Sequence, residues 1–258
     1  MAPAKDLSSY GVDPQAAEAE IGQDAAKIRQ NALLEEIYND VYTKLAAEVP
    51  PGEYPRLLEL GSGGGFFRDF APHAITSECA PVAGLDRVVD ACRITEHFEE
   101  SSLDAIAAFD VFHHLPDVTG FLRGASRVLR PGGRIALVEP WFTPLGQWFY
   151  RWIHNEPSIL DADDWNIVGE GRIGGANSRL PTSVFRDSDE RFAREFPKLK
   201  IVKREPFHKW LYFVSGGLRF NTHVPRALAK RLVWLDQRVA QGNQLFGLFA
   251  LIVVDRTT

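Results

Sequence analysis

The sequence predicts an α/β domain built on a mostly parallel sheet. Short apolar runs, typical of buried strands, alternate with segments in which apolar residues recur at helical spacing. The first run ends at a glycine cluster, residues 61–65, and acidic residues end or follow the next two runs. Strands that alternate with helices pair in parallel, because the helix carries the chain back to the start of the next strand.

The N-terminal part is predicted to be helical. Apolar residues recur every three to five positions from Pro14 to Glu48, and we expect an amphipathic helix that breaks near Gly22. The Pro-Pro-Gly run at 50–52 ends it. We therefore expect a helical segment at 1–52, a ligand-binding core at 53–140, and substrate loops with the remaining strands of the same domain at 141–258.

Apolar runs and turn residues place the other elements. A helix opens at Pro116-Asp117 and stops at Pro131-Gly132-Gly133, and residues 154–190 are expected to be mostly loop. A last helix covers 225–239, with Leu228, Leu232, Leu235 and Val239 on one face. The predicted strands are 56–60, 74–78, 85–89, 103–112, 134–139, 199–202, 210–214 and 248–254.

The glycine cluster marks the predicted ligand site. Glu59 lies two residues before Gly61, and Gly61, Gly63 and Gly65 follow a Gly-x-Gly-x-Gly register. Ligands of parallel sheets bind at the carboxyl ends of the strands, and glycines let the backbone approach them closely. Phe66 stands where a dinucleotide fingerprint needs its third glycine, which disfavours a nicotinamide-dependent oxidoreductase. The register favours a nucleoside with a charged amino-acid tail; the alternative is a structural turn.

Two acidic positions extend this site. Glu78 ends the second strand, 19 residues after Glu59, where a carboxylate can accept hydrogen bonds from ribose hydroxyls. Asp90-Ala91 follows the third strand, where an aspartate can accept from an adenine amino group. The alternatives are an ordinary acid at a strand end for Glu78 and a capping aspartate for Asp90.

Together these motifs resemble the type 11 family of methyltransferases that depend on S-adenosylmethionine (SAM). The resemblance covers roughly 56–140. Besides Glu59–Gly65, Glu78 and Asp90-Ala91, it rests on Asp110-Val111-Phe112-His113-His114-Leu115-Pro116-Asp117 and on Leu129-Arg130-Pro131-Gly132-Gly133.

This resemblance implies a Rossmann-like, doubly wound, seven-stranded sheet with the last strand antiparallel, an N-terminal helix and C-terminal lid or substrate elements. It implies SAM as cofactor, with Glu59 near its amino-acid end, the loop of Gly61, Ser62, Gly63 and Gly65 beneath it, Glu78 on the ribose and Asp90-Ala91 by the adenine. Phe109 is a further predicted cofactor contact. Because Cys79 and an unusual 80–85 stretch follow Glu78, Asp86 is a rival for the ribose.

Histidines and aromatic residues supply the candidate catalytic and substrate groups. His113 and His114 follow the fourth strand, beside the expected methyl position, where either could act as a base or simply pack against the cofactor. His154 and Glu156 form a second candidate pair, and none of these spacings predicts a metal site. The predicted substrate residues are Trp141, which opens an aromatic run to Trp152, His154 and Asn177.

Charge and composition limit the classes of partner that we expect. Residues 198–258 hold eleven Lys or Arg and three Asp or Glu, so this +8 tail either attracts an anionic acceptor or a membrane surface, or is plain solvated surface. No nucleic-acid-binding pattern is present, and the two cysteines favour a cytoplasmic protein with reduced thiols. We expect an enzyme that methylates a small-molecule or lipid- or glycan-linked acceptor. The alternative is a SAM-binding regulatory or assembly subunit without catalysis.

Overall fold

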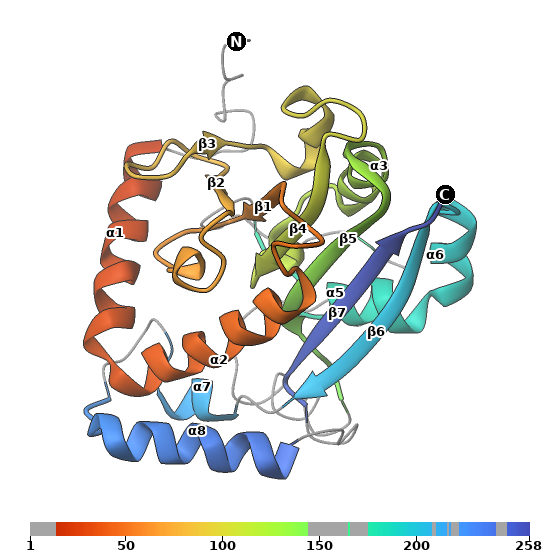
Figure 1. Ribbon diagram of the computed structural model, residues 1–258. Helices are drawn as coiled ribbons and strands as arrows, with labels where there is room; N and C mark the ends of the chain where they lie inside the picture. The colour runs from red at the N-terminus through yellow and green to blue at the C-terminus, as the bar shows by residue number, and fades with distance from the viewer. Residues whose placement is uncertain are drawn as a thin grey trace.

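A seven-stranded mixed sheet forms the centre of the computed structural model, which describes residues 14–143, 165, 175–207, 210–215, 217, 222–240 and 247–258 (Figure 1). The strand order is β3-β2-β1-β4-β5-β7-β6. Strands β1 to β5 pair in parallel, and β7 lies antiparallel between β5 and β6, which confirms the predicted sheet with its antiparallel last strand. The strands are β1 Leu57–Leu60, β2 Ile75–Glu78, β3 Arg87–Val88, β4 Leu103–Phe109, β5 Leu129–Pro140, β6 Leu199–Phe207 and β7 Phe249–Arg256.

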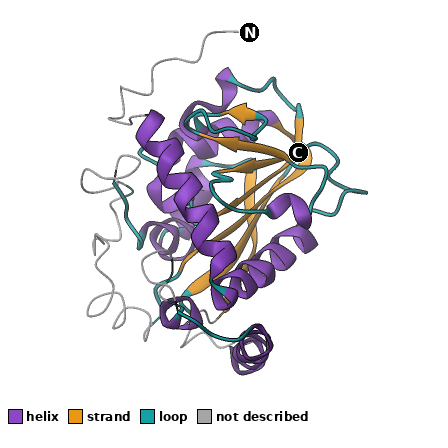
Figure 2. Ribbon diagram, turned by 90° about the vertical axis from the view of Figure 1, so that its left-hand side faces the viewer, coloured by secondary structure: helices purple, strands orange, loops and turns teal. Residues whose placement is uncertain are grey.

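Helices cover both faces of the sheet, because successive strand residues point to opposite sides. Leu58 and Ile106 belong to one apolar core, with residues of α3, Val118–Val128, and α6, Asp189–Glu195. Leu57 and Ala105 belong to the other core, beneath α2. Figure 2 looks onto the side that carries α1 and α2. Both faces of the central strands are therefore buried, as their continuous apolar runs predicted.

The N-terminal region forms two helices, α1 Pro14–Gln30 and α2 Ala32–Glu48. The predicted break near Gly22 is wrong: Gly22 lies within α1, and the break falls at Asn31. The Asn31 side chain accepts a hydrogen bond from the backbone N–H of Leu34 and donates one to the carbonyl of Ser215. A buried cap with a distant partner thus outweighs the cost of one glycine inside a helix.

The segment from β4 to β5 follows the prediction except at its end. Asp117 caps α3 by accepting from the N–H of Gly120. The helix ends at Val128, and the Pro131-Gly132-Gly133 turn lies inside β5, which already begins at Leu129. The turn is a local excursion, since the register with β4 shifts between the Leu103–Leu129 and Ala105–Arg134 pairs.

The C-terminal part requires three corrections. Trp210–Val214, predicted as a strand, is the helical turn α7, and its Leu211 packs with Leu33 of α2. The final helix α8, Arg226–Ala240, buries Ala229 and Val233 rather than the predicted leucine face. In the predicted loop 154–190, the described chain becomes helical from Leu180, through α5, Leu180–Thr182, and a π-helical turn to Asp187. No described helix has the length and apolar character needed to span a bilayer.

Candidate functional site

The acidic residues of the candidate site, two predicted and two not, gather at the carboxyl ends of β1, β2, β4 and β5. Glu59 lies in β1, Glu78 ends β2, Asp110 follows β4 and Glu139 lies near the end of β5. Because β1 is paired with both β2 and β4, and β4 with β5, these ends form one continuous edge. This is the edge at which ligands of open α/β sheets bind.

The glycine loop has a backbone that other residues could not adopt without strain. Gly61 has a φ of 63°, and a Cβ there would lie 2.3 Å from a methyl carbon of Val111. A Cβ on Gly64 would lie 2.4 Å from the backbone nitrogen of Ala25, because α1 passes directly over the loop. The loop is tied to β2, since the N–H of Ser62 donates to the carbonyl of Ser77 across 2.8 Å. The glycine backbone therefore packs closely against both the Val111 side chain and α1.

Glu59 is a buried acid whose one described hydrogen bond comes from a hydroxyl. Its Oε2 accepts from Oγ of Ser62 across 2.7 Å. Burial, with a smaller contribution from the nearby Glu78, raises the pKa of Glu59 to about 7, although the Ser62 bond opposes this shift. A cation brought to this carboxylate would restore its ionised form.

Glu78 and Asp86 occupy different places. Glu78 is buried at the end of β2, and its Oε2 accepts from the N–H of Cys79. Asp86 lies before β3, forms an ion pair with Arg68, and accepts from the backbone N–H and the hydroxyl of Thr76. Those hydrogen bonds, led by the backbone one, lower the pKa of Asp86. Asp86 thus holds β2 in place, whereas Glu78 is the acid at the carboxyl edge.

Asp90, Ala91 and Phe109 complete the set of predicted cofactor contacts. Asp90 is the N-cap of a 3-10 helix, Ala91–Glu96, and its Oδ1 accepts from the N–H of Cys92. Ala91 is buried against the core. Phe109, at the end of β4, makes an edge contact with Tyr38 of α2 at 5.1 Å between ring centroids. The capping alternative for Asp90 is thus present in the structure, and its adenine role stays a prediction.

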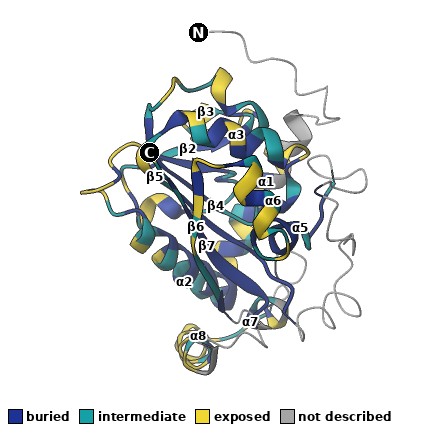
Figure 3. Ribbon diagram, turned by 90° about the vertical axis from the view of Figure 1, so that its right-hand side faces the viewer, coloured by how far each residue is buried: buried dark blue, intermediate teal, exposed yellow. Residues whose placement is uncertain are grey.

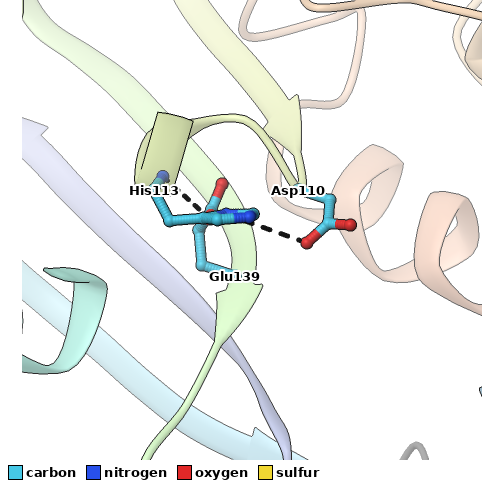
Figure 4. A group of neighbouring side chains, drawn as sticks. All are labelled: Asp110, His113 and Glu139. Carbon is cyan, nitrogen blue, oxygen red and sulfur yellow. Dashed lines mark hydrogen bonds and ion pairs between the residues drawn. The ribbon is translucent and has the colours of Figure 1, made fainter. Parts of the chain in front are cut away.

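Next to the glycine loop, three side chains converge around His113 (Figure 4). Nδ1 of His113 lies 2.8 Å from Oε2 of Glu139 and 3.8 Å from Oδ1 of Asp110. Both His113 and Glu139 are buried, with 1% and 0% of their surface exposed. Asp110 has a φ of 60°, a strained conformation for an aspartate that turns the chain sharply out of β4.

Glu139 also organises the backbone that carries His113. Its Oε1 accepts from the N–H groups of Val111 and Phe112 at 2.8 and 2.7 Å. Because an ionised carboxylate can only accept, Nδ1 of His113 is its protonated nitrogen and the basic lone pair is on Nε2. Glu139 therefore sets both the position and the tautomer of the imidazole.

His114 is fixed in a similar way by a carbonyl. Its Nδ1 lies 3.0 Å from the carbonyl oxygen of Gly175, and its ring is centred 4.0 Å from the ring of His113. His114 is half-buried, whereas His113 is fully enclosed. The Nδ1 atoms of the two histidines thus face different groups: carboxylates at His113 and a backbone carbonyl at His114.

The substrate predictions meet different outcomes. Asn177 is buried beside the histidines, and its N–H donates to the carbonyl of His113 across 2.9 Å. Trp141 is buried and its N–H bonds the carbonyl of Leu248, so its ring packs in the core. His154 lies outside the described residues. None of these positions tests contact with a substrate.

The Asp110, His113 and Glu139 ligand atoms lie within 4.8 Å of one another, a spread that one cation could bridge. The oxygens of Glu139, however, already accept from His113 and from backbone N–H groups. Hydrogen bonding accounts for the cluster, and the expected absence of a metal stays a prediction.

The cysteines are unreactive by environment. Cys79 and Cys92 are free, and burial raises the pKa of each thiol to about 12.

Sequence reasoning assigned no role to Glu139 or Asp110, although Asp110 begins one of the motifs and Glu139 ends the predicted strand 134–139. The signal was available: an acid ends a predicted strand next to the strand that leads into the two histidines. Their meeting depends on β4 pairing with β5.

Comparisons with known proteins agree with the fold and the motifs. Residues 58–137 match the family model described as a methyltransferase domain. The 27-O-demethylrifamycin SV methyltransferase of Amycolatopsis mediterranei is 32% identical over 170 residues, 56% of this chain and 57% of that protein. The ubiquinone biosynthesis O-methyltransferase of Xanthomonas oryzae is 28% identical over 101 residues, 32% of this chain and 41% of that protein. The chain thus spans about half the length of the curated relatives it matches.

Among solved structures, the geranyl diphosphate C-methyltransferase of Streptomyces coelicolor superposes with a TM-score of 0.51 at 13% identity, over 87% of this chain and 82% of that one. This likeness concerns the fold alone. Taken with the family match and the strand order, it confirms the resemblance on which the motifs were interpreted: residues 58–137 form a methyltransferase domain of the type 11 family, with the class I fold of SAM-dependent enzymes.

Proposed function

We propose that the chain transfers the methyl group of SAM to a hydroxyl oxygen of a small-molecule or lipid- or glycan-linked acceptor. The observation that carries this proposal is the carboxylate–imidazole pair of Glu139 and His113 at the sheet edge beside the glycine loop. Methyl transfer to a hydroxyl needs a base to take up its proton, and a histidine held in one tautomer is suited to that task.

The residues at the edge fit the cofactor that the family implies. Positive φ angles at Gly61 and Gly63 turn the backbone tightly at the carboxyl end of β1, where ligands of parallel sheets bind. Glu59 lacks a cationic hydrogen-bond partner among the described contacts, and the ammonium of an amino-acid tail would offset the burial that raises its pKa. Glu78 would hold the ribose hydroxyls and Asp90 the adenine. SAM would supply a methyl group already activated on a sulfonium.

The proton balance assigns one role to His113. SAM would supply the methyl group and leave as S-adenosylhomocysteine, and Nε2 of His113 would take up the proton of the acceptor hydroxyl. Glu139 then stabilises the imidazolium from the Nδ1 side, and Asp110 lies 3.8 Å away as a second negative charge. Burial of His113 keeps bulk water away from the transfer.

The choice of an oxygen acceptor has independent support. Two curated relatives of this chain are named 27-O-demethylrifamycin SV methyltransferase and ubiquinone biosynthesis O-methyltransferase. An imidazole base suits a phenol or another acidified hydroxyl better than a simple alcohol. The aromatic run after Trp141, which would favour an apolar acceptor, lies largely outside the described residues.

The test separates binding from catalysis. The purified chain is titrated with SAM and with S-adenosylhomocysteine by calorimetry, and S-adenosylhomocysteine release is then measured with a panel of phenolic, sugar and lipid-linked hydroxyl acceptors. We expect SAM to bind with micromolar affinity. The H113Q substitution should lower turnover by roughly a hundredfold or more without weakening the binding of SAM. H223Q, at an exposed histidine, is the matched control.

Two results would contradict the proposal. Absence of heat and of any shift in melting temperature with SAM would exclude the cofactor. Binding without turnover across the panel would instead favour a SAM-binding subunit that does not catalyse.

A further inference from the structure

Exposed apolar side chains gather at one place on the molecule. The large hydrophobic residues exposed in the described part of the chain are Val202, Val214, Leu228, Trp234 and Leu235, at 46%, 50%, 48%, 48% and 44%. All but Val202 lie on α7 and α8. Scattered exposed apolar residues need no explanation, but a cluster that includes a tryptophan indicates a binding surface.

The outer face of α8 combines these residues with arginines. Leu228, Arg231, Leu235 and Arg238 follow one another at steps of three and four, so they form a single stripe along the helix, with Trp234 beside it. All five are exposed. The guanidinium of Arg238 lies 4.4 Å from the ring centroid of Trp234. Figure 3 shows exposed residues along α8 at the lower end of the molecule.

The remaining charges of α8 point elsewhere. Arg226 and Lys230 form ion pairs with Glu35 and Glu36 of α2. The acid of the helix, Asp236, is buried against the body of the protein. The stripe is therefore uniformly basic, with no carboxylate from α8 beside Arg231 or Arg238.

We propose that the outer face of α8 docks on an anionic membrane surface. A helix that presents tryptophan and leucine together with arginine lies in the headgroup region of a bilayer, where apolar side chains enter the acyl boundary and arginines meet lipid phosphates. Charge complementarity favours this occupant, since residues 198–258 carry a balance of +8 within a chain of net charge −5. The inference does not depend on the proposed methyl transfer.

The position of α8 gives this docking a consequence. Strands β5 and β6 run in the same direction, because both are antiparallel to β7, and α7 and α8 follow the carboxyl end of β6. In Figure 1 α8 lies at that end of the sheet, beneath α2. Docking through α8 would hold the carboxyl end of the sheet, which carries the candidate site, toward the lipid.

The experiment is co-sedimentation of the full chain with phosphatidylcholine vesicles that contain either no phosphatidylglycerol or about a third of it, at low and high salt. We expect binding to the anionic vesicles alone, and release at high salt. R231Q/R238Q should weaken partitioning onto the vesicles about tenfold or more, because each arginine removed should weaken it roughly a few-fold to tenfold. W234S/L235S should weaken partitioning at low salt although both arginines remain, because the apolar contact is lost.

Two variants control for general effects. K198Q/K200Q removes the same charge at exposed positions around the start of β6, and V202S removes the exposed apolar residue outside the patch. Both should bind as the wild type does. Equal loss in K198Q/K200Q, or equal binding to neutral vesicles, would overturn the proposal. So would vesicle-independent self-association in sedimentation velocity that the patch variants abolish, since the face would then join two copies of the chain. Melting temperatures verify that each variant folds.

Discussion

Glu139 of β5 receives a hydrogen bond from Nδ1 of His113 across 2.8 Å, with both side chains buried. The same carboxylate accepts the N–H groups that begin the turn after β4. A buried charge is tolerated only where such partners replace water. The hydrogen bonds of Glu139 therefore offset the cost of burying its carboxylate. They also orient the imidazole of His113, whose Nε2 lies on the opposite side of the ring.

Replacing Glu139 by glutamine should separate catalysis from binding. The amide can still accept the N–H groups of Val111 and Phe112, but it cannot stabilise an imidazolium as a carboxylate does, and it can present an N–H to Nδ1. We expect kcat to fall roughly a hundredfold while the dissociation constant of SAM changes less than twofold. Steady-state kinetics and calorimetry measure the two quantities. A parallel loss of SAM binding would mean that Glu139 only supports the fold.

Replacing Glu59 by glutamine should stabilise the free protein at alkaline pH. The folded state raises the pKa of Glu59 to about 7, whereas in the unfolded chain it is about 4.5. Between these values the folded state binds the extra proton, so its stability falls as the pH rises. Glu59→Gln escapes this penalty and still accepts from Ser62. We expect E59Q to gain up to about 3 kcal/mol at pH 8 and nothing at pH 4.

Urea unfolding at both pH values measures this difference. The same variant should bind SAM more weakly, because the neutral amide gives no ionic attraction to the ammonium of the cofactor. An E59Q protein with the pH dependence of the wild type would show that Glu59 is not the group that titrates. Unchanged SAM affinity would remove Glu59 from the cofactor site while leaving the stability argument intact.

The sequence predicted the sheet well because its strands are short apolar runs bounded by turn residues, a pattern that depends on neighbours in the chain. The aromatic and branched residues of Trp210–Val214 have the same local character, and they form a helical turn instead. There the contacts of Leu211 with α2 decide the structure. A local sequence pattern carries no information about such contacts between distant parts of the chain.

The features of the candidate site also differ in whether the local sequence could predict them. The positions of the glycine loop and of Glu78 were predictable, since each lies where its own strand ends. The partner of His113 was not, because Glu139 is 26 residues away and reaches the histidine through the pairing of β4 with β5. The break at Asn31 likewise depends on the carbonyl of Ser215, 184 residues away. Predictions from sequence were thus good within elements and poor between them.

Replacing Asp104 by asparagine should weaken the sheet at its other edge. Asp104 is buried at the start of β4, where it pairs with Arg56, which precedes β1, and with Arg130 of β5. Hydrogen bonding by Arg56, more than any other contact, holds the pKa of this acid well below its usual range. We expect D104N to lose about 2–3 kcal/mol of unfolding free energy at pH 7.

The loss should depend on pH with a definite sign. A lowered pKa stabilises the folded state above the unfolded value of about 3.9, and this contribution disappears as the pH falls through that value and below. Wild type and D104N should therefore converge in stability toward pH 2, as measured by chemical unfolding. A difference that stays constant between pH 7 and pH 2 would assign the effect to packing instead of charge.

Replacing Gly61 by alanine tests whether the glycine loop is built for a ligand or only for a turn. Alanine at Gly61 meets two obstacles, the positive φ of 63° and the methyl group of Val111 at 2.3 Å. Gly84 is the matched control, since its φ is 86° but nothing lies within 4 Å of a Cβ there. We expect G84A to cost about 1 kcal/mol of stability and leave SAM affinity unchanged. G61A should lower stability more than G84A does. It should also weaken the binding of SAM at least tenfold, because Val111 and the loop must move apart. If G61A folds and binds SAM like G84A, the loop is a structural turn, and the cofactor must be held chiefly by the acids at the strand ends.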